Sequence, residues 1–226
     1  MNDWKMDGKP GLVVLHMQQG LVGKGTRIPR WFEAAKKVIL ESGMTDRIQD
    51  LLKAFRAEGL PVVFVSSLGN PIGTVPAYGR LYANIEHTRG PEMAKMEANF
   101  VDNPRVREIV EVIPELSRRP DEPLLINWLL GGFTNSGLDL VLKLRGVRTI
   151  VLVGFALHSI VYNTAVQAGD LWYSTIIPRD ASAVCVPPTF PGASPELDKK
   201  VTDVVLDVLA PTISLVTTSA DVIAHL

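Results

Sequence analysis

Cysteine is almost absent from this chain, which has 226 residues and a single thiol, Cys185. One thiol cannot form an internal disulfide framework, and it excludes a zinc site built from cysteines. The charges nearly cancel, with a net charge of −1, which gives no electrostatic reason to expect nucleic acid or an anionic membrane as partner. No apolar run approaches the roughly 20 residues that cross a bilayer. We therefore expect a small molecule as partner, with no nucleic acid and no membrane.

The first eleven residues lack the apolar core of a secretory signal peptide, so a cytoplasmic protein is expected. A length of 226 residues fits one large core, because single cores grow to roughly 250–300 residues before they split. The hydrophobic share of 46% and the charged share of 21% are ordinary for a globular protein. We predict one domain over residues 1–226, with residues 1–10 as an N-terminal extension.

Six short apolar runs are rich in β-branched residues. They lie at residues 11–16, 61–66, 123–127, 149–154, 173–178 and 212–216. Apolar runs of this length are typical of strands that are buried on both faces, as in a parallel sheet.

Segments with helical spacing lie between these runs, at residues 45–58, 136–145, 159–168 and 197–209. The first of them carries one apolar stripe, with Thr45 as the expected N-cap and Gly59 just past its end. Strands that alternate with helices predict right-handed βαβ units. The fold class is therefore α/β: a doubly wound, three-layer α/β/α domain around a six-stranded, mostly parallel sheet.

Two stretches interrupt the alternation, residues 20–43 and 68–105. Both follow the carboxyl ends of the first two strands, where open α/β sheets bind ligands. Connections this long are usually functional or disordered, and the sequence leaves open whether these form a pocket lid or an oligomer contact. Aromatic and apolar pairs, Trp31–Phe32 and Leu81–Tyr82, are hard to place in a single core. Because aromatic residues are enriched at interfaces, we expect a homo-oligomer.

Three segments, in order along the chain, share spacing with a known family. The first strand is followed by His16, Met17 and Gln18, and the segment after the third strand keeps Phe133, Ser136 and Leu138. The third segment, residues 154–165, keeps the following positions: Gly154, Ala156, Val161, Thr164 and Ala165. Together they resemble the isochorismatase-like cysteine hydrolases, and the similarity spans about residues 11–223. The resemblance implies the same three-layer fold.

The resemblance also implies a catalytic triad of Asp, Lys and Cys, in which the thiolate attacks an amide or related carbonyl. In such a site the carboxylate takes the thiol proton, and backbone amides stabilise the oxyanion. In this chain His16, Asn127 and Ile160 stand at the three positions. Isoleucine has no nucleophilic atom, so we expect an atypical, non-cysteine site at these residues.

The two polar residues at these positions, His16 and Asn127, can still take part in proton transfer or hydrogen bonding. His16 fits a general acid or base, because imidazole titrates near neutral pH; the other interpretation is a neutral, hydrogen-bonded histidine without turnover. Asn127 donates and accepts hydrogen bonds but carries no charge, so it suits a neutral polar ligand. Cys185 is interpreted as a buried small residue rather than a relocated nucleophile.

Four further residues are candidates for substrate binding: His158, Trp128, Phe155 and Ser66. His158 lies near a predicted helix start, where it can pair with His16, bind a ligand or cap the helix. Trp128 fits a core or interface residue equally well, and a turn or cap role suits Ser66. Two histidines and an asparagine make a poor metal site without a carboxylate, so no metal is expected. Gly131-Gly132 lacks a nucleotide-binding fingerprint, and no cofactor is expected.

Two functions remain open from these residues. One is a hydrolase-family protein that binds or hydrolyses a small polar metabolite, favoured by the polar side chains of His16 and Asn127. The other is a catalytically silent relative that serves as a binding or assembly subunit. Ile160 favours the second, because it places apolar bulk at the nucleophile position.

Overall fold

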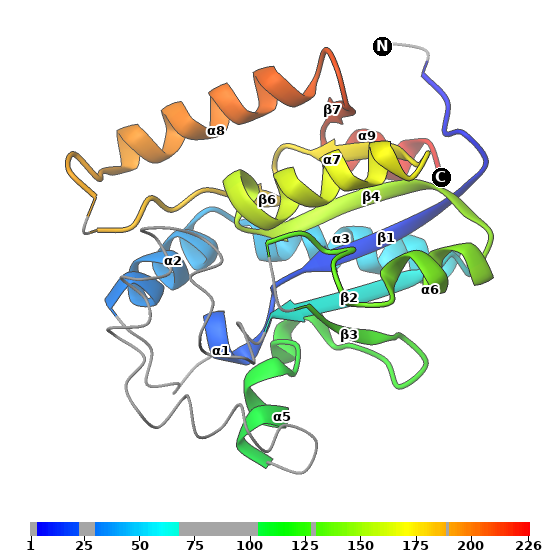
Figure 1. Ribbon diagram of the computed structural model, residues 1–226, viewed down its shortest axis with the longest axis horizontal. Coiled ribbons are helices and arrows are strands. Elements are labelled where there is room, and N and C mark those ends of the chain that lie inside the picture. Colours follow the sequence, from blue (N-terminus) through cyan, green and yellow to red (C-terminus); the bar gives the residue numbers. More distant parts are fainter. Residues whose placement is uncertain (1–3, 23–29, 68–103, 128–129, 189) are drawn as a thin grey trace.

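The computed structural model describes residues 4–22, 30–67, 104–127, 130–188 and 190–226. Within these ranges a seven-stranded sheet runs in the order β3-β2-β1-β4-β5-β7, and β6 pairs with β4 (Figure 1). Each named pair of neighbouring strands is parallel. The strands are β1 (Lys9–Leu15), β2 (Val62–Ser67), β3 (Leu124–Asn127), β4 (Val147–Phe155), β5 (Ser174–Pro178), β6 (Ser182–Ala183) and β7 (Ser214–Thr217). All six predicted strands are present, and the additional one is the two-residue β6.

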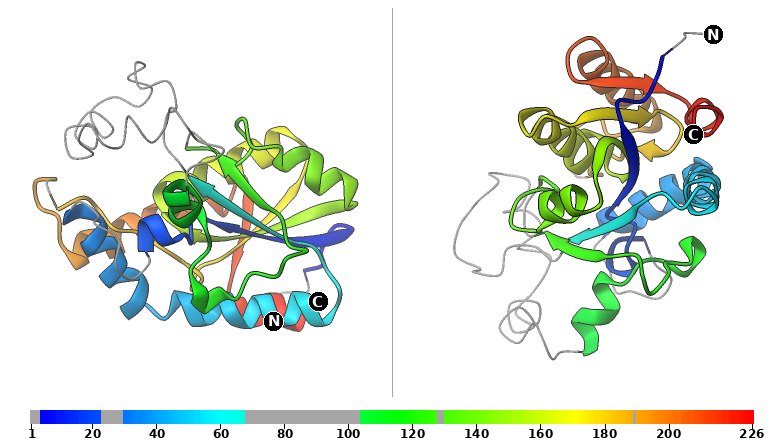
Figure 2. Two further views of the ribbon diagram at one scale, coloured as in Figure 1. Left: turned by 90° about the horizontal axis from the view of Figure 1, so that it is seen from below. Right: turned by 90° about the vertical axis from the view of Figure 1, so that its right-hand side faces the viewer.

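Helices cover both faces of this sheet. Figure 2 shows α3 and α9 on one side of it and α6 and α7 on the other. The α-helices are α1 (Gln19–Val22), α2 (Arg30–Glu41), α3 (Met44–Ala57), α5 (Pro104–Val110), α6 (Leu138–Leu144), α7 (Tyr162–Asp170), α8 (Pro195–Leu209) and α9 (Ser219–Ala224). A 3-10 helix, η1 (Pro114–Leu116), and a π-helix, η2 (Leu157–Val161), complete them. The predicted doubly wound α/β/α architecture is confirmed.

The central strand β1 shows why the apolar runs are continuous. Leu12 and Val14 belong to the core cluster that includes the buried side of α3. Val13 and Leu15 belong to the cluster with α6 and α7 on the opposite face. Successive side chains of a strand point to opposite faces, so a strand covered on both sides needs apolar residues at every position.

The start of α3 differs from the prediction. Thr45 is not the N-cap, because the helix begins one residue earlier, at Met44, after Gly43 with a left-handed φ of 72°. The Thr45 hydroxyl is buried and has no hydrogen-bond partner among the described residues. The predicted apolar stripe is confirmed, since Ile48 and Phe55 are fully buried.

The carboxyl ends of β1, β2 and β4 lie side by side. Leu15 is in register with Val65 on one side and with Gly154 on the other. A Cβ atom on Gly154, whose φ is 121°, would collide with the Leu15 carbonyl oxygen. Glycine therefore permits the close approach of β1 and β4 at the residue that precedes His16.

Some predictions fall on residues that the structure does not describe. Residues 23–29 and 68–103 lie outside the described ranges, as do Leu81–Tyr82 and the side chains of Trp31 and Phe32. The choice between a pocket lid and an oligomer contact stays open, and the homo-oligomer stays a prediction. None of the described helices has the length and apolar character that a membrane crossing requires.

Candidate functional site

His16 and Asn127 meet at the carboxyl edge of the sheet. His16 directly follows β1 in a left-handed conformation, with a φ of 54°, and its backbone N–H donates to the Val65 carbonyl at 2.7 Å. Asn127 is the last residue of β3. The His16 Nε2 and Asn127 Oδ1 atoms are 2.9 Å apart. Residues that are 111 positions apart in sequence are thus in direct contact, because parallel strands end at the same edge.

The hydrogen bonds of Asn127 determine which nitrogen of the His16 imidazole carries the proton. The Asn127 Nδ2 group donates to the Gly131 carbonyl oxygen at 3.4 Å, so its Oδ1 atom faces His16 as an acceptor. A hydrogen bond to this oxygen requires the proton on Nε2 of the imidazole. The remaining lone pair of His16 is therefore on Nδ1.

The hydrogen bonds continue from this pair to Ile160. The Gly131 carbonyl, which accepts from Asn127, and the Gly132 N–H belong to the same peptide group. This N–H donates a hydrogen bond to the Thr164 hydroxyl at 2.9 Å. That hydroxyl donates to the Ile160 carbonyl oxygen at 2.6 Å. We call this series the His16–Ile160 hydrogen-bond chain. All its members are buried, and in such surroundings consecutive hydrogen bonds polarise and strengthen one another.

Two glycines make room for this chain. A Cβ atom on Gly132 would lie 2.8 Å from the Thr164 hydroxyl oxygen, and one on Gly131 would overlap the Gln167 amide. The loop after β3 therefore packs directly against α7. The sequence showed only that Gly131-Gly132 lacks a nucleotide-binding fingerprint and that Thr164 matches the family segment. In the structure the two glycines and Thr164 connect Asn127 with Ile160.

His16, Asn127 and Ile160 carry little or no charge near neutral pH. Burial lowers the pKa of His16 from 6.5 to about 4, and the hydrogen bond to Asn127 opposes this effect only in part. His16 is therefore a neutral imidazole at pH 7. Asn127 and Ile160 are fully buried.

His158 has an electrostatic interaction with α8. It lies in η2 and is half-buried, and its Nδ1 atom has no hydrogen-bond partner in the described part of the chain. Burial lowers the pKa of His158, while the Asp198 carboxylate on α8 raises it. Among the described side chains, His16 is hydrogen bonded to Asn127 and not to His158.

The other candidate binding residues lie in different environments. Phe155 is buried in the core cluster on the α3 side of the sheet, whereas Ile160 belongs to the opposite cluster. Ser66 is 1% exposed within β2, where it is in register with Ile126. Trp128 lies outside the described residues.

Cys185 and Ile160 pack in different core clusters. It is 2% exposed and packs in the cluster on the α3 side. Burial, with a contribution from the Asp198 carboxylate, raises the pKa of the Cys185 thiol to about 11. At neutral pH this side chain is a thiol and not a thiolate, which is the reactive form.

Gln18 holds the ends of two strands together. Its side-chain amide pairs with the backbone of Ser67, donating to the carbonyl at 2.7 Å and accepting from the N–H at 2.5 Å. Its Nε2 group also donates to the Ile109 carbonyl at 3.1 Å. The sequence indicated Gln18 only as a family match, because the partners of a buried amide are not visible in a local pattern. Within the described ranges, no group of three His, Cys, Asp or Glu side chains is placed to hold a metal ion.

Comparison with known proteins places this arrangement in a family. The model of the isochorismatase domain matches residues 10–192. The ureidoacrylate amidohydrolase RutB of Stutzerimonas stutzeri is 25% identical over 76% of this chain and 68% of its own length. The protein of the same name from Pseudomonas syringae pv. syringae is 26% identical over 77% of this chain and 71% of its own length.

Solved structures show the same fold. A cysteine hydrolase from Pseudomonas syringae pv. phaseolicola superposes with a TM-score of 0.72 at 23% identity, over 100% of this chain and 98% of that chain. An isochorismatase family protein from Burkholderia thailandensis gives a TM-score of 0.69 at 22% identity, over 98% of this chain and 97% of that one. Because the domain model matches most of its length, this chain belongs to the isochorismatase family.

Proposed function

We propose that this hydrolase-like protein has an atypical, non-cysteine site that binds a small, uncharged polar metabolite. His16, Asn127 and Ile160 stand where the resemblance implies Asp, Lys and Cys. The observation that carries the proposal is the His16–Ile160 hydrogen-bond chain, which joins these three positions through buried polar groups without an ionised side chain.

Thiol chemistry is not supported at this place. Ile160 has no nucleophilic atom, and its side chain is fully buried in the core. The backbone N–H groups of Ser159 and Val161 both donate to the Ala156 carbonyl, at 3.1 and 3.3 Å. These two amides are therefore occupied and do not stabilise an oxyanion.

The electrostatics favour an uncharged ligand. The hydrogen-bond chain has no cation to compensate a buried carboxylate, and an unpaired buried charge is costly. The Nδ1 lone pair of His16 accepts a hydrogen bond, so a ligand with N–H donors fits it. By their name, the relatives cited above act on ureidoacrylate. Its ureido group offers such donors without charge, and we propose an amide or carbamoyl compound as the ligand class.

Hydrolysis by His16 is the second candidate function, favoured by its Nδ1 lone pair, which has no hydrogen bond to another side chain in the described part of the chain. A neutral imidazole accepts a proton from water during attack on the bound amide, although a pKa of about 4 makes it a weak base. In this case His16→Ala lowers the rate at least about 100-fold, the usual scale for a general acid–base group. The silent-subunit alternative is favoured by the buried apolar side chain of Ile160.

Calorimetric titration with N-methylurea, an uncharged ureido compound, tests the binding proposal, and ureidoacrylate serves as the charged comparison. We expect N-methylurea to bind and ureidoacrylate to bind more weakly, because its carboxylate finds no compensating cation at the site. We expect His16→Gln to weaken N-methylurea binding by about five- to tenfold. The glutamine amide can still donate to Asn127 Oδ1 but loses the Nδ1 acceptor, and one hydrogen bond contributes about 1 kcal/mol. Ammonia release, measured in parallel, separates binding from turnover.

His225→Gln is the matched control, because His225 is exposed at the end of α9 and hydrogen bonds to Asp221. Binding by this variant should equal that of the wild-type protein. Failure of the wild-type protein to bind N-methylurea would contradict the proposal and favour the silent subunit.

Iodoacetamide is expected to leave ligand binding and any turnover unchanged at neutral pH. With its pKa at about 11, Cys185 is a thiolate in only about one molecule in ten thousand, and its side chain is buried. Mass spectrometry should show slow labelling of the folded protein and complete labelling in denaturant. Rapid stoichiometric labelling with loss of binding, prevented by N-methylurea, would instead identify Cys185 as a relocated nucleophile.

A further inference from the structure

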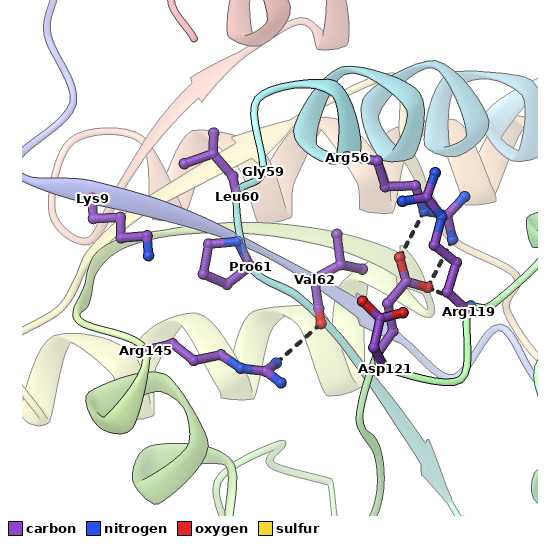
Figure 3. Close-up of a pocket in the computed structure, with 10 residues that line it drawn as sticks. Lys9, Arg56, Gly59, Leu60, Pro61, Val62, Arg119, Asp121 and Arg145 are labelled. Atoms are coloured by element: carbon purple, nitrogen blue, oxygen red, sulfur yellow. Dashed lines mark hydrogen bonds and ion pairs between the residues drawn. The ribbon is translucent and has the colours of Figure 1, made fainter.

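A cavity lies at the edge of the sheet opposite to His16, where β1 and β2 begin. Its volume is about 310 Å³, within the usual range of small-molecule pockets. Figure 3 shows the side chains that line it. Its charged lining residues are Lys9, Arg56, Arg119, Asp121, Glu122 and Arg145.

Two of these charged residues, Arg56 and Glu122, form an ion pair with each other. Arg56 binds Glu122 through two hydrogen bonds, from Nε to Oε1 at 2.7 Å and from a terminal nitrogen to Oε2 at 2.8 Å. The second oxygen also accepts from the Arg119 backbone N–H at 2.7 Å. Arg56 donates further to the Ser117 carbonyl at 3.0 Å. This pair contributes no net charge to the cavity, so the net charge of the lining comes from the four other charged residues.

The remaining charges are predominantly positive. Lys9, Arg119 and Arg145 are three cations and Asp121 is one anion, which gives a net charge of +2. No ion pair joins the Lys9 ammonium or the Arg119 guanidinium to another residue in the part of the chain that the structure describes. Arg145 makes one long hydrogen bond, 3.5 Å to the Val62 carbonyl. The excess charge matches a dianion.

The cations come from separate elements. Lys9 is the first residue of β1, and Arg145 directly follows α6. Figure 3 shows these two side chains to one side of Val62, with Arg119 and Asp121 to the other. Gly59 leaves the wall open, because a Cβ atom there would meet nothing within 4 Å.

We propose that this cavity binds a small phosphorylated metabolite. The phosphoryl group lies between Lys9 and Arg145, because guanidinium groups bind phosphate through two parallel hydrogen bonds and lysine binds it as a point charge. The cavity extends past Val62 to Asp121, whose carboxylate accepts hydrogen bonds from hydroxyl groups of the same ligand. A phosphorylated sugar has both features.

The proposal is independent of the amide-binding function. Lys9 and His16 are at opposite ends of β1, roughly 20 Å apart at the usual rise of a strand. The His16→Gln variant should therefore keep its affinity for the phosphorylated ligand. Failure of one proposal leaves the other in place.

Calorimetric titration with ribose 5-phosphate tests the cavity, with ribose and inorganic phosphate as reference ligands. We expect ribose 5-phosphate to bind and ribose not to bind. Lys9→Gln and Arg145→Gln should each weaken binding at least tenfold. Asp121→Asn should weaken binding of ribose 5-phosphate more than that of inorganic phosphate.

Arg148→Gln is the matched control, since Arg148 is 62% exposed and lies 3.7 Å from Asp7, outside the cavity lining. Its affinity should stay within about twofold of the wild-type value. An equal loss in this variant would show a general charge effect and overturn the proposal, as would the absence of binding by the wild-type protein. Inorganic phosphate that binds as tightly as ribose 5-phosphate would overturn the role assigned to Asp121.

Discussion

Replacement of Glu122 by alanine is expected to lower the free energy of unfolding by about 3–5 kcal/mol, the usual cost of removing one partner from a buried ion pair. The side chains of Arg56 and Glu122 are only 13% and 7% exposed. Loss of the carboxylate leaves the Arg56 guanidinium desolvated, and it also removes the acceptor of the Arg119 N–H. Urea unfolding of the wild-type and variant proteins measures the difference.

Glu111→Ala is the matched control, because Glu111 also binds an arginine through two hydrogen bonds, at 2.9 and 3.1 Å. The Glu111 and Arg118 side chains are 47% and 23% exposed, and such a pair typically contributes at most about 1 kcal/mol. The double variant Arg56→Met/Glu122→Leu should recover most of the lost stability, because no buried charge remains unpaired. Equal losses for Glu122→Ala and Glu111→Ala would contradict the buried-pair explanation.

Acidification is expected to destabilise the protein through His16. The unfolded chain binds a proton at this histidine near pH 6.5, whereas the folded protein does so only near pH 4. Between these values the unfolded state holds more protons, so the His16 contribution to stability falls as the pH falls. The complete change is about 3 kcal/mol, of which about 2 kcal/mol is lost by pH 5. Above pH 6.5 the His16 contribution is constant.

Denaturant unfolding of the wild-type and His16→Gln proteins at several pH values isolates this contribution. The variant cannot titrate at this position, so its stability should fall less steeply between pH 6.5 and 5. His158→Gln provides the comparison, since burial also lowers the pKa of His158 and the His16 component should persist in that variant. Identical pH profiles for wild type and His16→Gln would show that His16 does not resist protonation in the folded state.

The strands and the longer helices were predictable because their signals are local. A run such as residues 11–16 is apolar at every position, and β1 is covered by helices on both faces. The stripe of α3 has the spacing of one helical face. The two-residue β6 has no such pattern; it forms because β4 extends far enough to pair with Ser182 and Ala183. Thr45 was misassigned because the path of the chain before a helix decides which residue caps it.

The contact of His16 with Asn127 at the carboxyl edge of the sheet agrees with the sequence prediction, but the hydrogen bonds that orient these side chains were not predictable. The family segments placed His16, Asn127 and Ile160 at the carboxyl ends of strands. The proton on His16 Nε2, in contrast, follows from the Asn127 amide, which is oriented in turn by the Gly131 carbonyl. The electrostatic effect on His158 follows from the position of α8, which carries Asp198. His16 and Asn127 are 111 residues apart in sequence, and His158 and Asp198 are also in separate elements, so no local spacing rule relates them.

Residue type and periodicity alone determined that this chain alternates buried strands with amphipathic helices, and that Ile160 provides no nucleophile. Both are properties of single residues or of one element. The tertiary structure decided the neutrality of His16, the pairing of Arg56 with Glu122 and the excess of cations at the opposite edge of the sheet. The physical reason is that burial and hydrogen bonding set the charge state of a group. Both depend on which distant segments surround that group after folding.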